Sequence, residues 1–111
     1  MDLQIKLSKL EQELDIAIKK LRETGREYAE AYTNYRIELA KELLKLKADG
    51  YAISLANDIA RGKPEIAHLK FEEISKEAIY KANQESILAT KLKMKIIEEQ
   101  INREYSLSEN K

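Results

Sequence analysis

A stretch in the middle of the chain, with residues that interrupt helices, decides the fold: Gly50-Tyr51-Ala52-Ile53-Ser54-Leu55-Ala56-Asn57-Asp58-Ile59-Ala60-Arg61-Gly62-Lys63-Pro64. It holds two of the three glycines and the only proline of the 111 residues. On either side, apolar residues recur every three or four positions, which is typical of amphipathic helices. The sequence therefore predicts two long helices, over 1–49 and 64–105, joined by a bend over 50–63.

The ends of the two long helices can be placed from the residues that border the bend. Gly50 follows a turn that contains Lys45 and Lys47, and a glycine after cationic residues is a common helix C-terminus. Pro64 suits the first turn of a helix, where its missing N–H costs nothing. Glu65 beside it complements the positive end of the helix dipole.

The bend itself is expected to contain a short helix. Ser54 can cap a helix over Leu55–Arg61, which Gly62 then ends. The apolar positions of this piece share one face: Leu55, Ile59 and Ala56. We expect the bend to carry a small apolar plug of its own.

The first arm carries one apolar seam at a spacing of about 3.6 residues, the period of an α-helix. Its members are Leu3, Leu7, Leu10, Leu14, Ile18, Leu21, Gly25, Tyr28, Tyr32, Tyr35, Leu39, Leu43 and Leu46. Gly25 on this seam is either a point of close packing or a break in the helix. The ladder of three tyrosines is expected to pack against the returning helix.

The second arm carries two apolar stripes. One is rich in alanine and is expected to pack closely on the first arm: Ala67, Phe71, Ile74, Ala78, Ala82, Ala89, Leu92 and Ile96. The other would stay in water in a monomeric hairpin and is expected to form an oligomer interface: Tyr80, Ile87, Met94, Ile97 and Ile101. Burying each such side chain is worth roughly 1.5–3 kcal/mol. We therefore expect an all-α, coiled-coil-like antiparallel hairpin that dimerises into a four-helix bundle or forms a higher assembly. A flexible tail is expected over 106–111.

Composition narrows the class of protein. The net charge is zero, with equal numbers of acidic and basic residues in each arm, and no cysteine is present. A neutral surface argues against non-specific binding to duplex nucleic acid. No run reaches the roughly 18 apolar residues of a membrane span. We expect a cytoplasmic protein that binds no membrane and no cofactor.

Catalytic chemistry has little support in this sequence, which contains a single histidine. Glu65 and His68 have the Glu-x-x-His spacing of metal-binding helical bundles, which makes a ferritin-like metal bundle a minor alternative. The glutamate is also what the first turn of a helix favours. We expect no metal site and no enzymatic activity.

A recognition surface is expected at the bend, because loops held by rigid elements commonly carry binding residues. Polar and aromatic residues are concentrated where the chain reverses: Asp49, Tyr51, Asn57, Asp58, Arg61, Lys63 and His68. A solvated surface with local ion pairs is the other interpretation of these residues.

Two segments resemble small uncharacterised helical proteins encoded by phages and prophages of Gram-positive bacteria: Tyr35–Lys41 and Leu55–Glu72. The resemblance implies a phage-encoded protein in the host cytoplasm and supplies no catalytic residues. The function we expect is that of an adaptor or inhibitor of a host or phage macromolecule. The alternative is a nucleic-acid accessory protein in phage replication or recombination, which implies binding through Lys41, Lys45, Lys91 and Lys93.

Overall fold

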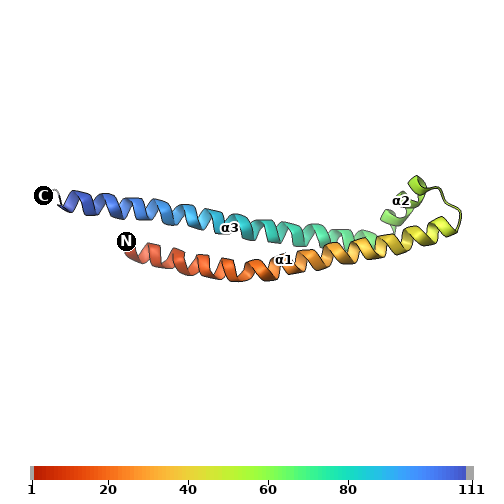
Figure 1. The fold of residues 1–111 in the computed structure, drawn as a ribbon, viewed down its shortest axis with the longest axis horizontal. Helices are drawn as coiled ribbons and strands as arrows, with labels where there is room; N and C mark the ends of the chain where they lie inside the picture. The colour runs from red at the N-terminus through yellow and green to blue at the C-terminus, as the bar shows by residue number, and fades with distance from the viewer. Residues whose placement is uncertain (1, 110–111) are drawn as a thin grey trace. The chain divides into compact units, whose positions relative to one another are not determined.

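A computed structural model describes residues 2–109, and this part of the chain forms three α-helices and no strand. The helices are α1 (Leu3–Ala48), α2 (Ile53–Gly62) and α3 (Pro64–Glu109), shown in Figure 1. The expected all-α hairpin with a short helix at its bend is confirmed. α3 continues beyond its expected end at Tyr105, because no glycine or proline interrupts 106–109. Of the expected flexible tail, residues 110–111 lie outside the described residues.

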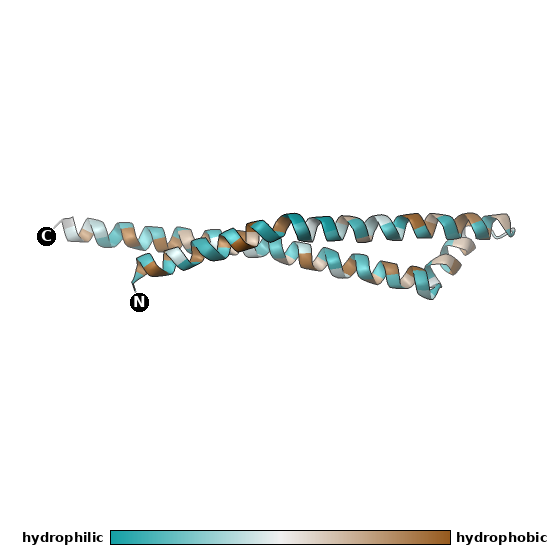
Figure 2. Cartoon of the chain, turned by 90° about the horizontal axis from the view of Figure 1, so that it is seen from below, coloured by the Kyte–Doolittle hydropathy of each residue, from teal (hydrophilic) through white to brown (hydrophobic). Residues whose placement is uncertain are grey.

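The chain forms two compact units. One unit combines the part of the chain up to Glu23 with the part from Lys81 onwards, and the other is Thr24–Tyr80. In each unit, a segment of α1 runs antiparallel to a segment of α3 (Figure 1). Hydrophobic residues alternate with hydrophilic ones along the helices (Figure 2), so each helix has an apolar side to bury.

The C-terminus of α1 is closed by Gly50, as the sequence predicts. Its φ of 93° lies in the left-handed region, which favours glycine. The Gly50 N–H donates to the Lys47 carbonyl at 3.1 Å, and the Tyr51 N–H donates to the Leu46 carbonyl at 3.1 Å. This pair of bonds is a Schellman motif, which satisfies carbonyls that the end of the helix leaves open.

Gly50→Ala is expected to lower the free energy of unfolding by about 1–2 kcal/mol, the cost of placing an L-residue in the left-handed region. Gly62→Ala is the matched control, since Gly62 has no positive φ and its added Cβ meets no atom within 4 Å. Urea unfolding followed by circular dichroism measures both variants. Equal effects at the two glycines would contradict this account of the bend.

α2 begins two residues before its expected start. Ala52, with an extended backbone at φ −65° and ψ 149°, takes the N-cap position and makes no side-chain cap bond. The expected cap by Ser54 is therefore wrong, because this residue lies inside the first turn. The buried face of α2 also differs: Ala56 and Ala60 are buried, whereas Leu55 is 51% exposed. Two small residues let α2 approach its neighbours more closely than a leucine allows.

A single residue, Lys63, separates α2 from α3. Its backbone is extended, at φ −68° and ψ 135°, as the steric effect of a following proline favours. Pro64 is the first residue of α3, which confirms its predicted place. The direction of the chain thus changes sharply between two helices without a loop.

The core of the Thr24–Tyr80 unit lies where the three helices meet. Its cluster of buried residues comprises Tyr35, Leu39, Leu46, Ala56, Ala60 and Ile66, with Leu43, Ile59 and Leu69 packed against it. Of these, Ala60 is completely inaccessible to solvent. The apolar plug expected in the bend is therefore part of the core of this unit.

α1 passes through Gly25 without a break, so the packing interpretation of this glycine is confirmed. A Cβ added there would lie 3.1 Å from the Cε1 atom of Tyr80. The Tyr80 ring also packs against Tyr28, with centroids 6.0 Å apart. The tyrosine ladder is only partly buried, because Tyr35 is 6% exposed but Tyr32 is 47% exposed.

The other unit has its own seam between α1 and α3. Ala17, Ile87 and Thr90 are buried there. The Asn83 amide donates a hydrogen bond of 2.9 Å to the Ala17 carbonyl, which fixes the two helices against each other. Ile18 was expected on this seam but is 47% exposed, because the small residue before it takes the inward position.

The assignment of the two stripes of α3 is reversed in the structure. The stripe expected to form an oligomer interface faces α1 within the units: Ile87 is buried, and Tyr80, Met94, Ile97 and Ile101 are half-buried. These residues are therefore not an exposed interface, and that prediction is wrong. The alanine-rich stripe, expected to face α1, is the exposed one. Both stripes have helical periodicity, and periodicity does not say which of two apolar faces turns inward.

Candidate interaction surfaces

The bend residues predicted from the sequence fall into two groups. Asp49, Tyr51, Asp58 and Arg61 are exposed, as a recognition surface requires. Asp49 and Tyr51 lie in the connection between α1 and α2, and Asp58 and Arg61 lie on α2. Their charges are mixed, with two carboxylates and one guanidinium, so they offer no surface of a single sign.

The other three bend residues have partners within the chain. The Asn57 amide donates to the Ile53 carbonyl at 3.1 Å. The Lys63 ammonium donates to the Glu42 carboxylate and so ties the α2–α3 junction to α1. His68 lies 3.9 Å from Glu72, one turn further along α3. Asn57 and Lys63 therefore support local structure, whereas the His68 ring is exposed. The sequence did not separate Asn57 and Lys63 from the exposed residues.

The bond between Lys63 and Glu42 shifts the pKa of both groups. It lowers the pKa of Glu42 below its usual 4.5 and raises the pKa of Lys63 above its usual 10.5, while partial desolvation opposes each shift. The carboxylate therefore contributes stability that is complete above about pH 4.5 and is lost as the pH falls through its folded pKa. The ammonium contributes stability that is complete below about pH 10.5 and is lost as the pH rises through its folded pKa.

Glu42→Gln is expected to destabilise the protein at neutral pH and to match the wild type in acid. The difference should shrink below pH 4.5, where the wild-type carboxylate is itself protonated. Thermal unfolding across a pH series measures it. Glu38→Gln is the control, since its partner Lys41 lies on the exposed surface and the pair should contribute less. A difference for Glu42→Gln that stays constant from neutral to acidic pH would contradict the role given to this ion pair.

An apolar groove beside the bend was not anticipated from the sequence. It has a volume of about 380 Å³ and is lined by Ala40, Leu43, Leu44, Lys47, Ile53, Ala56 and Asn57. Leu44 is 69% exposed and Ile53 is 62% exposed. The signal was present, because Leu44 falls outside the seam of α1. A single apolar residue outside a seam does not by itself indicate a groove, since exposed apolar residues are common.

A long row of exposed apolar residues lies on α3, and we call it the outer face: Ala67, Phe71, Ile74, Ala78, Ala82, Ala89, Leu92 and Ile96. All eight residues are exposed, and the four large ones strongly so: Phe71 63%, Ile74 57%, Leu92 60% and Ile96 48%. Successive members are three or four residues apart, except for the seven residues from Ala82 to Ala89, which equal two helical turns, so all eight share one face of the helix. The single charged residue at this spacing is Glu85, also exposed.

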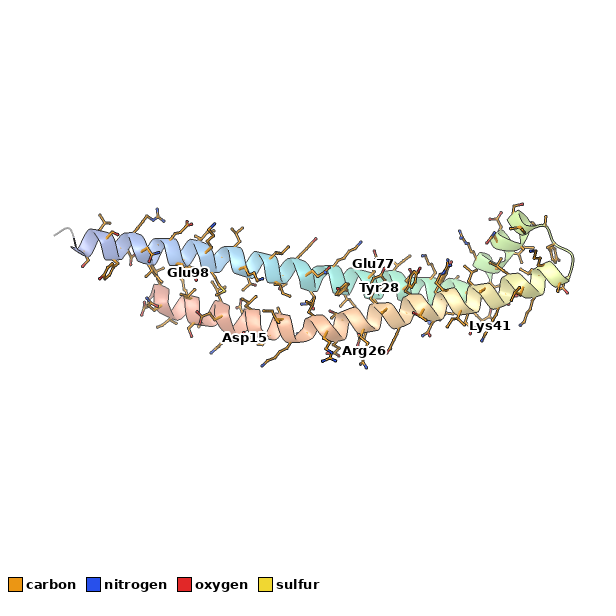
Figure 3. All side chains as sticks on the ribbon, viewed as in Figure 1. Asp15, Arg26, Tyr28, Lys41, Glu77 and Glu98 are labelled. Carbon is orange, nitrogen blue, oxygen red and sulfur yellow. The ribbon has the colours of Figure 1, made fainter. Side chains whose placement is uncertain are left out.

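Polar contacts within the Thr24–Tyr80 unit hold α3 against α1. Glu73 is buried and pairs with Lys70 at 2.8 Å, and this ammonium also lies 4.8 Å from the centre of the Tyr35 ring. The pKa of Lys70 is raised by its bond to the carboxylate. Tyr28 and Glu77 lie together between the helices (Figure 3), and the hydrogen bond to this carboxylate raises the pKa of the tyrosine.

Neither a metal cluster nor a membrane span is found in the part of the chain that the structure describes. Between residues 2 and 109, no group of three or more histidine, cysteine, aspartate or glutamate side chains is placed to hold a metal ion. His68 stacks on Phe71 at the exposed surface, with ring centroids 6.5 Å apart. Over the same residues, no helix combines the length and apolar character that crossing a membrane requires.

The fold and these surfaces define an all-α helical hairpin with an exposed apolar face. Comparison with known protein families, curated proteins and solved structures finds no match to this chain. The resemblance to phage proteins thus gains no support from relatives and stays a prediction.

Proposed function

We propose that this protein is a non-catalytic interaction protein that works as a self-associated helical assembly. The observation that supports it is the outer face of α3. A row of eight apolar residues on one helix is more than the scattered exposed leucines of an ordinary surface, and such patches mark sites of protein interaction.

The size of the effect favours association. Full burial of a large apolar side chain is worth roughly 1.5–3 kcal/mol, and about half of each large residue on the outer face is exposed. Four such residues in each of two copies therefore offer on the order of 6–12 kcal/mol before the cost of association. That is enough for a stable dimer if the two surfaces fit each other.

A second copy of the chain is the occupant we propose. The four alanines of the outer face allow two helices to approach closely. The assembly would bring together four long helices, two from each copy, as a bundle requires. The exposed bend residues Asp49, Tyr51, Asp58 and Arg61 would stay free to contact a host or phage protein.

The molar mass in solution tests this proposal. Sedimentation equilibrium across a wide range of concentrations is expected to show a species of twice the 12.9 kDa chain mass. A mass of 12.9 kDa at every concentration would contradict self-association and with it the proposed function.

A further inference from the structure

We propose that the apolar groove beside the bend binds an amphipathic helix of a partner protein, one that presents large apolar residues one turn apart with carboxylates beside them. The inference rests on the proposed interaction role and names the chemistry of the partner. All residues that line the groove belong to the Thr24–Tyr80 unit, and none of them belongs to the outer face. Self-association through the outer face therefore does not use these residues.

The shape of the groove suits large apolar side chains. Leu44 on α1 and Ile53 on α2 are its large exposed members. Ala40 and Ala56 also line it, and they leave space that a small side chain does not fill. Covering Leu44 and Ile53 removes apolar surface from water, which is favourable. A helix that lays its apolar edge into a groove is a recurring mode of peptide recognition.

Positive charge borders this groove. Lys47 lines it and has no carboxylate partner among residues 2–109. One helical turn outside the lining residues lie two more cations, Arg36 on α1 and Arg61 on α2. All three side chains are exposed, so they can reach a molecule that lies in the groove.

The acidic residues of the same segments lie on other sides of the helices. A helix turns by about 100° per residue, which places Glu38 and Glu42 on the side of α1 opposite the groove. Both already bond to lysines. Asp58 is turned away on α2 in the same manner. The pKa of Lys63 is raised first by its bond to Glu42 and also by Asp49, which places Asp49 on the Glu42 side. The groove thus presents cations, and complementary potentials favour an acidic partner.

Synthetic peptides test the proposal on the wild-type chain. The probe is a helical peptide with leucines at every third and fourth position and glutamates on both sides of that row. One matched peptide carries lysines in place of the glutamates, and another carries serines in place of the leucines. An NMR titration of the isotope-labelled protein is expected to show shifts centred on the lining residues with the acidic peptide. The other two peptides should bind at least about tenfold more weakly.

Two variants locate the site. Leu44→Gln should weaken binding of the acidic peptide about tenfold, because a wall of the groove is lost. Lys47→Glu should reverse the preference and bind the lysine peptide more tightly than the acidic one. Lys45→Glu is the matched control, since Lys45 lies on the other side of α1 and should leave both affinities unchanged. All three replaced residues are exposed, and circular dichroism checks the helical content of each variant.

The outcomes separate this inference from the proposed function. Absence of binding, binding no tighter than that of the matched peptides, or shifts centred on the outer face would overturn the groove site and leave self-association standing. A lower molar mass for Leu44→Gln than for the wild type would mean that a second copy occupies the groove, and would also overturn the inference. A monomeric chain whose groove binds the acidic peptide would overturn self-association alone.

Discussion

Leu39→Ala is expected to lower the free energy of unfolding by about 2–5 kcal/mol, the range for removing a buried leucine side chain. Leu39 is 6% exposed and belongs to the cluster that joins all three helices of the Thr24–Tyr80 unit. The loss combines the transfer of apolar atoms with a cavity that the surrounding helices cannot fill.

Leu44→Ala is the matched control. It replaces the same residue type on the same helix, but its side chain is 69% exposed, so we expect a change of less than about 0.5 kcal/mol. Urea unfolding at a fixed protein concentration compares the two, because association makes stability depend on concentration. Equal losses for Leu39→Ala and Leu44→Ala would show that the core of this unit has been placed on the wrong face of α1.

The double variant Phe71→Gln/Ile74→Gln is expected to weaken self-association at least about 100-fold. Two large side chains are removed from each copy, and each contributes roughly 1 kcal/mol or more to the interface, against 1.4 kcal/mol for a tenfold change. Both residues are exposed in the single chain, so the helical content should stay that of the wild type. Analytical ultracentrifugation with circular dichroism measures both quantities.

Ile79→Gln is the control for this prediction. Ile79 is 48% exposed on the same helix but does not share the outer face. We therefore expect it to leave the dissociation constant unchanged. If Ile79→Gln weakened self-association as much as the double variant, the effect would come from surface hydrophobicity in general. If the double variant left self-association unchanged, the outer face would not be the interface.

The backbone preferences of single residues allowed much of the fold to be predicted. Gly50 ends α1 and Pro64 begins α3 because each residue has a backbone preference that acts within one turn. Gly25 was correctly placed on the seam from its spacing alone. The prediction from Ser54 failed, because α2 begins at Ile53 and Ser54 therefore lies inside the helix. A residue type that favours the cap position does not fix where a helix starts.

The candidate surfaces were harder to predict. Asn57 and Lys63 have the composition of a binding surface, but each bonds within the chain. The groove at Leu44 and Ile53 arises from two elements that meet only in the folded bend. A sequence shows which residue types are close along the chain, and these surfaces depend on contacts between separate helices.

The order of residues along the chain was enough to predict a helical hairpin, the place of its bend, and two apolar stripes on α3. Which of these stripes turns inward was settled by contacts between the helices. The stripe with Tyr80 and Ile87 packs on α1, because the Tyr80 ring fits over Gly25 and the Asn83 amide reaches the Ala17 carbonyl. A helical period fixes the angle between residues on one helix, whereas the inward face depends on how their shapes match those of a neighbouring helix.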